Sequence, residues 1–144
     1  MARHDPLGNF RFRLEIDGLQ VAGFSEVSIG ATSVEIIEYR EGNEPAHVRK
    51  LPGLRKSADV TLKRGMTASM ELYDWHRQVL QGQIATARRN VVVIVEDETG
   101  ADQARFVVTG AWPAKYEACH LNARGNEVLI ETLELANEGI ERLQ

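Results

Sequence analysis

The sequence has little cysteine, no cationic excess and no long apolar run. Its single cysteine, Cys119, cannot form a disulfide within the chain, which is typical of proteins kept in a reducing compartment. Lys and Arg number 17 against 21 Asp and Glu, and this net charge of −4 argues against a general binder of nucleic-acid backbones. The longest apolar run, residues 91–95, is far shorter than the ~20 residues of a membrane-spanning helix. We therefore expect no membrane span.

What is present fits one folded domain over residues 1–144. Hydrophobic residues make up 43% and charged residues 26% of the chain, as in ordinary globular proteins. A chain of this length buries roughly 68–70% of its unfolded surface behind one core. The first ten residues contain charge and proline but no apolar stretch, so we expect no secretory signal and assembly in the cytoplasm.

Alternating apolar and charged residues predict a half-buried strand at residues 9–16. Its polar face carries Arg11, Arg13 and Glu15. The Asp17-Gly18 pair suits a tight turn, so a return strand is expected at residues 19–24. After a loop, residues 34–40 predict a third strand with apolar side chains on both faces.

Residues 41–57 change in character to charge, Gly, Pro and Asn. Only a short strand, at residues 47–51, is expected within this excursion. Loops of more than ~12–15 residues in compact domains are usually functional or disordered, so this segment is a candidate functional loop.

The remainder alternates strands and turns around one helix. Strands are expected at residues 59–63, 91–95, 104–112 (stopped by Pro113) and, last in the chain, 127–136, with a turn at residues 97–100. A helix is expected at residues 68–81, with Thr67 or Ser69 as N-cap and Gly82 just beyond its end. Its apolar stripe consists of Leu72, Trp75, His76, Val79 and Leu80. The pattern predicts a mainly β fold, an antiparallel β-barrel or sandwich with one flanking α-helix.

No constellation for catalysis, metal or cofactor binding is recognisable. The histidines, His4, His47, His76 and His120, do not form a spaced ligand set with Cys119. No phosphate-binding glycine loop or nucleophile elbow occurs. Asp97-Glu98 falls in a predicted turn, and a solvated hairpin tip is the simpler interpretation. His76 is interpreted as a packed histidine at the boundary between helix and sheet rather than a general base.

One basic cluster also has two interpretations. Arg49-Lys50 and Arg55-Lys56 flank a predicted turn at residues 51–54. Without interleaved aromatic residues, charge facing solvent or an interface is the better interpretation than phosphate binding.

Several segments of the chain together resemble the myophage-type, contractile tail tube protein family. They are residues 5–12, 15–18, 21–28, 38–43, 49–54, 60–65, the helix with Trp75, and residues 133–140.

The resemblance implies a structural subunit of the inner tube of a contractile phage tail or injection system. In that family six copies close into a ring, and rings stack around a channel for protein or DNA cargo. A sheath surrounds the tube, and a baseplate and spike lie at one end. The resemblance implies no enzyme activity and no cofactor. The chain is thus expected in a phage tail or a phage tail-like particle.

Under this hypothesis the excursion is an assembly loop that reaches a neighbouring subunit or ring. Arg11, Arg13 and Glu15 are candidate lumen-facing residues, with ordinary solvent exposure as the alternative. Two other functions stay open: a baseplate-proximal tube initiator or adaptor of the same fold that binds the spike, and a hydrolase, for which no paired carboxylates can be named. The candidate assembly-loop residues are Glu41, Gly42, Asn43, Glu44, Arg49, Lys50, Leu51, Pro52, Gly53, Arg55 and Lys56.

Overall fold

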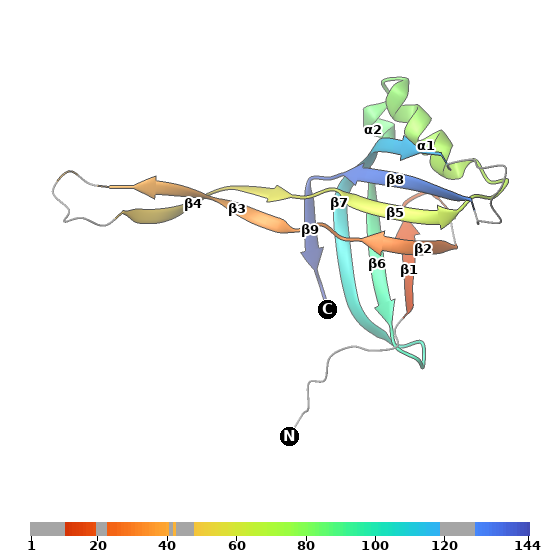
Figure 1. The fold of residues 1–144 in the computed structure, drawn as a ribbon, viewed down its shortest axis with the longest axis horizontal. Coiled ribbons are helices and arrows are strands. Elements are labelled where there is room, and N and C mark those ends of the chain that lie inside the picture. Colours follow the sequence, from red (N-terminus) through yellow and green to blue (C-terminus); the bar gives the residue numbers. More distant parts are fainter. Residues whose placement is uncertain (1–10, 20–22, 41, 43–47, 119–128) are drawn as a thin grey trace.

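A computed structural model describes residues 11–19, 23–40, 42, 48–118 and 129–144. They form a β-rich body with two helices at one end and a long two-stranded arm at one side (Figure 1). The elements are β1 (Arg11–Ile16), β2 (Phe24–Ser28), β3 (Thr32–Tyr39), β4 (Arg49–Ser57), β5 (Val60–Gly65), α1 (Glu71–Leu80), α2 (Ile84–Ala87), β6 (Arg89–Glu96), β7 (Asp102–Glu117), β8 (Ile130–Ala136) and β9 (Gly139–Arg142).

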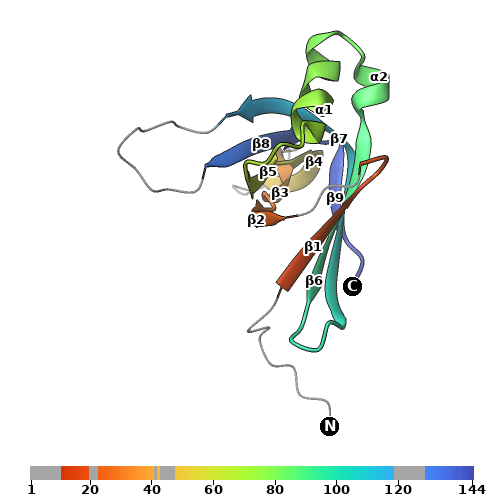
Figure 2. The ribbon, with the colours of Figure 1, turned by 90° about the vertical axis from the view of Figure 1, so that its right-hand side faces the viewer.

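The body is one antiparallel sheet that changes direction along β7. The first part of β7 pairs with β6 on one side and β9 on the other, and β1 follows β6. The last part of β7 pairs with β8, which continues through β5 to β2. The two halves cross at a steep angle and face each other (Figure 2). The prediction of a mainly β, antiparallel barrel or sandwich is confirmed.

Gly110 and Pro113 lie where β7 passes from one half to the other. Gly110 has φ 61, a left-handed backbone conformation that favours glycine. Pro113 was expected to stop this strand, and that prediction is wrong. It lies opposite Leu135, and the register shifts between Pro113 and Lys115, an irregularity of the kind that accommodates a residue without an N–H.

The core lies between the two halves of the sheet and beneath the helices. It is made of alternate side chains of each strand, so the predicted period of two is confirmed in β1, where Ile16 is buried while Arg11, Arg13 and Glu15 are exposed. The buried apolar residues of this core cluster are Ile16, Val60, Leu62, Leu72, Trp75, Ala87, Val91, Val93, Val108, Ala111, Leu133 and Leu135, and Ile94 and Ala104 are buried outside it.

The predicted opening hairpin is only partly present. Gly18 has φ 74, as a tight turn requires, and Leu19 forms an isolated bridge with Ile16. The strand that begins at Phe24, however, pairs with β5 and not with β1. Residues 20–22 of the expected return strand lie outside the described residues, and Phe24, its last residue, belongs to β2, whose apolar face completes the second half of the sheet.

The helical region differs from the prediction in three details. α1 begins later than expected, with Met70 as N-cap, although Thr67 and Ser69 accept hydrogen bonds from the N–H groups of Ser69 and Glu71. A short second helix, α2, follows, and the Trp75 indole N–H donates to the Ala87 carbonyl within it. The spacing of Leu80 placed it in the buried stripe. It is 66% exposed and is the last residue of α1. A ninth strand, β9, also follows the one expected to be last.

A buried ion pair closes one end of the core. Arg64 of β5 and Glu131 of β8 face each other across the ladder, with Nε and Oε1 2.6 Å apart and both side chains 4% exposed. The Tyr116 hydroxyl donates to the other oxygen of Glu131 at 2.7 Å. Both carboxylate oxygens are thus satisfied, which a charge removed from water requires.

The two leucines of α1 offer a matched test of this packing. Leu72, 2% exposed, lies in the core, whereas Leu80 does not. Leu72→Ala should lower the free energy of unfolding by about 2–5 kcal/mol through lost burial and a cavity. Leu80→Ala should change it by less than about 0.5 kcal/mol. Urea titration followed by tryptophan fluorescence measures both, and equal losses would contradict the placement of α1.

The ion pair predicts a non-additive pair of substitutions. Glu131→Leu leaves the Arg64 guanidinium buried without its partner and should cost about 3–5 kcal/mol of unfolding free energy. The double variant R64M/E131L removes both charges and should recover most of that loss. The same urea titration compares them, and a double variant as unstable as the single one would show that the pair is not the source of the cost.

Candidate functional site

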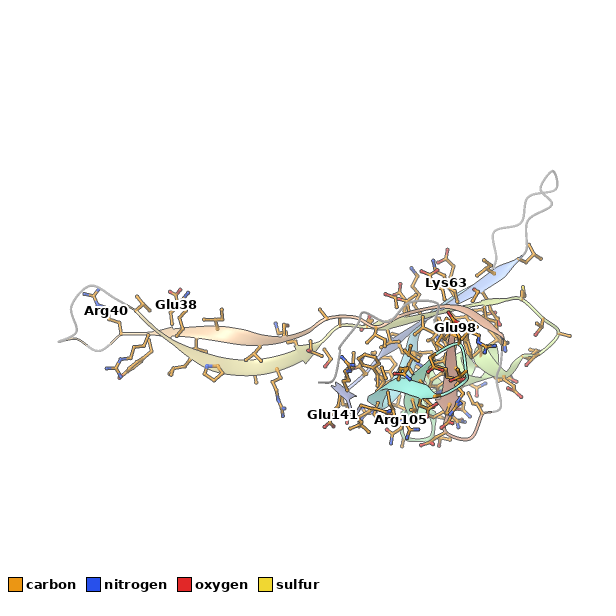
Figure 3. All side chains as sticks on the ribbon, turned by 90° about the horizontal axis from the view of Figure 1, so that it is seen from below. Glu38, Arg40, Lys63, Glu98, Arg105 and Glu141 are labelled. Carbon is orange, nitrogen blue, oxygen red and sulfur yellow. The ribbon has the colours of Figure 1, made fainter. Side chains whose placement is uncertain are left out.

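The arm is a β-hairpin formed by β3 and β4. The two strands pair antiparallel with each other, from Thr32 opposite Ser57 to Tyr39 opposite Arg49, in a sheet of their own. Figures 1 and 3 show the arm reaching far beyond the body, with Glu38 and Arg40 labelled near its outer end. Every residue of β3 is exposed. The arm therefore has almost no core of its own chain to pack against.

Residues 41–57 were expected to be mostly loop, and for β4 that prediction is wrong. Nine residues, Arg49–Ser57, form a strand that includes the expected turn at residues 51–54, and all of them except Gly53 and Leu54, which lie at a register shift, have a partner on β3. Pro52 lies opposite Ile36, beside a register shift between Val34 and Ile36. A proline is tolerated there because the arm has only two strands, each with one edge that needs no N–H for pairing. The Pro, Gly and charged residues of this segment are typical of a loop, so composition did not predict the strand.

The predicted assembly residues divide between this strand and the hairpin tip. Arg49, Lys50, Leu51, Pro52, Gly53, Arg55 and Lys56 all lie in β4. Gly42 is an exposed turn residue, while Glu41, Asn43 and Glu44 lie outside the described residues. The two basic pairs do not form one cluster. They lie toward opposite ends of β4, on the order of 16 Å apart along an extended strand.

Large apolar side chains are exposed on both faces of the arm. Ile36 is 64% and Leu54 71% exposed. Alternate residues of a strand share a face, so Val34 and Ile36 lie on one face of β3. Ile37 lies on the other face, which it shares with its cross-strand partner Leu51. An isolated two-stranded hairpin is marginally stable in water, and a contiguous exposed apolar surface marks an interaction site. The sequence pattern predicts apolar residues on both faces of β3, but it does not reveal that the whole strand is exposed.

The exposed face of β1 belongs to a network of charges. Arg13 lies 2.9 Å from Glu96 of β6, 3.6 Å from Asp102 of β7 and 3.9 Å from Glu15. Arg105 of β7 lies 3.2 Å from Asp102. The candidate lumen-facing residues thus lie on one mixed-charge surface that spans three strands, and their partners on β6 and β7 were missed by sequence reasoning.

This half of the sheet also has two unpaired edges within the described residues. β1 pairs with β6 alone, apart from the bridge to Leu19, and β9 pairs with β7 alone. Exposed strand edges present N–H and C=O groups that another chain can pair with.

A cleft of about 770 Å³ lies where the arm leaves the body. Arg55 and Lys56 line it from β4, and Glu138 and Glu141 line it from the segment that contains β9. Its lining contains no histidine or cysteine, and Glu138 is already paired with Arg88 at 2.6 Å. The cleft offers charge complementarity and no set of groups for covalent chemistry.

His76 and Asp97, the two candidate acid–base groups among the described residues, have structural roles. His76 Nδ1 lies 3.0 Å from the Pro113 carbonyl and must donate to it, and its ring stacks on Tyr116. Asp97 organises the turn between β6 and β7. Hydrogen bonds from the Thr99 hydroxyl and the Ala101 N–H hold the pKa of Asp97 below its usual value. The packed position expected for His76 and the turn expected at Asp97-Glu98 are confirmed.

No group of three or more potential metal ligands occurs among residues 11–19, 23–40, 42, 48–118 and 129–144. His4, His47, Cys119 and His120 lie outside those ranges. In the same ranges, neither helix has the length and hydropathy needed to span a membrane.

Solved structures with this fold include chains of contractile injection systems and an Hcp1 protein. A chain in the cryo-EM sheath–tube complex of an extracellular contractile injection system, PVC, in the extended state has a TM-score of 0.83 and 22% identity, covering 96% of this chain and 91% of that one. A chain in the anti-feeding prophage tube-terminating cap gives 0.80 and 21%, covering 99% and 94%. Hcp1 from Flavobacterium johnsoniae gives 0.54 and 15%, covering 91% and 93%. No curated protein matches the chain.

The sequence resemblance has a direct counterpart in a family comparison. The family model for the T4-like virus tail tube protein gp19 matches residues 8–141, which includes the body and the arm. The chain therefore belongs to the T4-like virus tail tube protein family.

Proposed function

We propose that this chain is the repeating subunit of the inner tube of a contractile phage tail or injection system, with six copies in each ring and rings stacked into a tube. The observation that carries the proposal is the arm. It exposes apolar side chains on both faces and cannot cover them with its own chain. Contact with other copies would remove that surface from water, at roughly 25 cal/mol per Å².

The unpaired sheet edges support ring closure. Pairing of β1 in one copy with β9 in the next continues the same sheet from subunit to subunit and covers both edges of this half of the sheet. Such a contact uses two different surfaces of each copy, so a fixed rotation closes it into a ring. Stacking of rings then needs a further contact, for which the arm has the reach.

In such a ring the charged face of β1, β6 and β7 lines the channel, because the opposite face is the core. Arg11, Arg13 and Glu15 would lie in the lumen. Arg13 is neutralised by Glu96 and Asp102. The wall would therefore be polar without a strong field of one sign, a surface along which protein or DNA cargo can pass without tight binding.

The related assemblies indicate the partners. The similar chains occur in a sheath–tube complex, a tube-terminating cap and the baseplate of an injection system. We propose a sheath protein around this tube, baseplate and spike proteins at one end, and assembly in the cytoplasm. The cap and baseplate matches also favour the second candidate, a baseplate-proximal initiator or adaptor of the same fold that binds the spike. An enzymatic role has no support from the family, which consists of tube proteins.

Ile36 and Leu80 allow a matched test, because their exposed fractions are 64% and 66%. Ile36→Asp places a charge on the arm surface proposed to be covered in the tube, and Leu80→Asp places one at the end of α1. We expect Ile36→Asp to abolish rings and tubes of the purified protein in negative-stain electron microscopy, and Leu80→Asp to leave them intact.

The unfolding midpoint of each variant serves as the control and should stay close to that of the unmodified protein, because both positions are exposed. Normal tubes from Ile36→Asp would contradict the role of the arm.

A further inference from the structure

The end of the body farthest from the arm carries a second exposed apolar surface. Figure 1 shows that β5 ends and β8 begins at this end, where the connection to α1 also lies. Met70 is 55% and Met66 45% exposed, and Tyr73, Leu129 and Ile130 each expose more than a third of their surface. We call the surface formed by Met66, Met70, Tyr73, Leu129 and Ile130 the distal patch.

Backbone pairing and a ring contact tie the distal patch to the body. The Met66 N–H donates to the Leu129 carbonyl at 2.7 Å, and Gly65 pairs with Ile130. The Tyr73 ring meets Tyr116 edge-on at 5.4 Å, directly beside the buried Arg64–Glu131 pair. The patch therefore rests on the end of the core that holds the buried Arg64–Glu131 pair.

The charges around the two apolar surfaces are complementary. The arm is basic on balance, because Arg49, Lys50, Arg55 and Lys56 of β4 outnumber Glu35 and Glu38 of β3, although Glu38 lies opposite Lys50. Beside the distal patch, Glu71 opens α1 and the exposed Glu117 ends β7, and neither forms an ion pair with another described residue. One oxygen of Glu71, Oε2, is shielded from water and has no hydrogen-bond partner among the described residues. Arg77, whose guanidinium lies 5.9 Å from the Tyr73 ring centroid, is itself paired with Asp74 at 2.8 Å. A basic occupant therefore suits Glu71 and Glu117, since complementary charge selects a partner and orients it.

From these observations we infer that the distal patch is the docking surface for the arm of a second copy of this chain. The arm and the distal patch lie at opposite ends of the long axis of the molecule, so their contact cannot form within one chain. It uses two different surfaces of each copy, as a head-to-tail assembly requires. This inference rests on the proposed tube function and adds to it the surface that receives the arm.

Photo-crosslinking tests the docking whatever the register between the two copies. Leu54, the most exposed of the apolar arm residues at 71%, is replaced by p-benzoyl-phenylalanine in the full chain. Assembled tubes are irradiated, and the crosslinked peptides are identified by mass spectrometry. We expect crosslinks to peptides that contain residues 66–73 or 129–130. The same replacement at Leu80 is the matched control and should not crosslink to the arm.

Crosslinks from Leu54 only to other regions, in tubes of normal appearance, would overturn the distal patch while leaving the tube function intact. Failure of the unmodified protein to form rings or tubes would instead contradict the proposed function.

A charge exchange keeps the test decisive if the bulky replacement prevents assembly. Glu117→Lys should raise the concentration needed for tube formation about tenfold, and E117K/K50E, which restores opposite charges between copies on the outer part of the arm, should return it to within about threefold of the original. A double variant that assembles no better than Glu117→Lys would overturn the pairing of these two surfaces.

Discussion

The arm cannot bury its apolar side chains within its own chain, and the rest of the account depends on this constraint. β3 and β4 pair only with each other, and Ile36 and Leu54 are mostly exposed. A two-stranded hairpin of this kind gains little stability alone. The strands nevertheless carry the β-branched and aromatic residues of a buried sheet, so their sequence suits a state in which other copies cover them. The proposed assembly would therefore cover the surface that the arm exposes in the single chain.

The body has the buried apolar core that the arm lacks. The bend of β7 at Gly110 and Pro113 lets one strand join both halves of the sheet, which enclose a continuous apolar core. The opposite face of β1, β6 and β7 is charged. Among the described strands, β1 and β9 form the unpaired edges of this half of the sheet. A rigid subunit with a polar wall and open edges is suited to a tube that must keep its shape under load, because the contacts between copies then determine the geometry of the assembly.

The sequence predicted those features that depend on local pattern. Alternation in residues 9–16 correctly separates Ile16 from Arg13, and the spacing of Leu72 and Trp75 correctly gives the buried stripe of α1. Features set by pairing were missed. Nothing local to Phe24 tells whether its strand pairs with β1 or β5, and Pro52 and Gly53 suggested a loop where cross-strand pairing with β3 imposes a strand. The partners of Arg13 and the distal patch come from strands far apart in sequence, so no local pattern could reveal them.

Hydrogen exchange of the arm amides, measured by mass spectrometry in the monomer and in assembled tubes, tests the central claim most directly. In the monomer the amides of β3 and β4 should exchange within seconds to minutes, while those of β6 stay protected, because a hairpin without a core opens readily. In tubes the arm should become protected to a degree that approaches β6. Arm amides that exchange equally fast in monomer and tube would contradict the claim that the arm is covered by other copies.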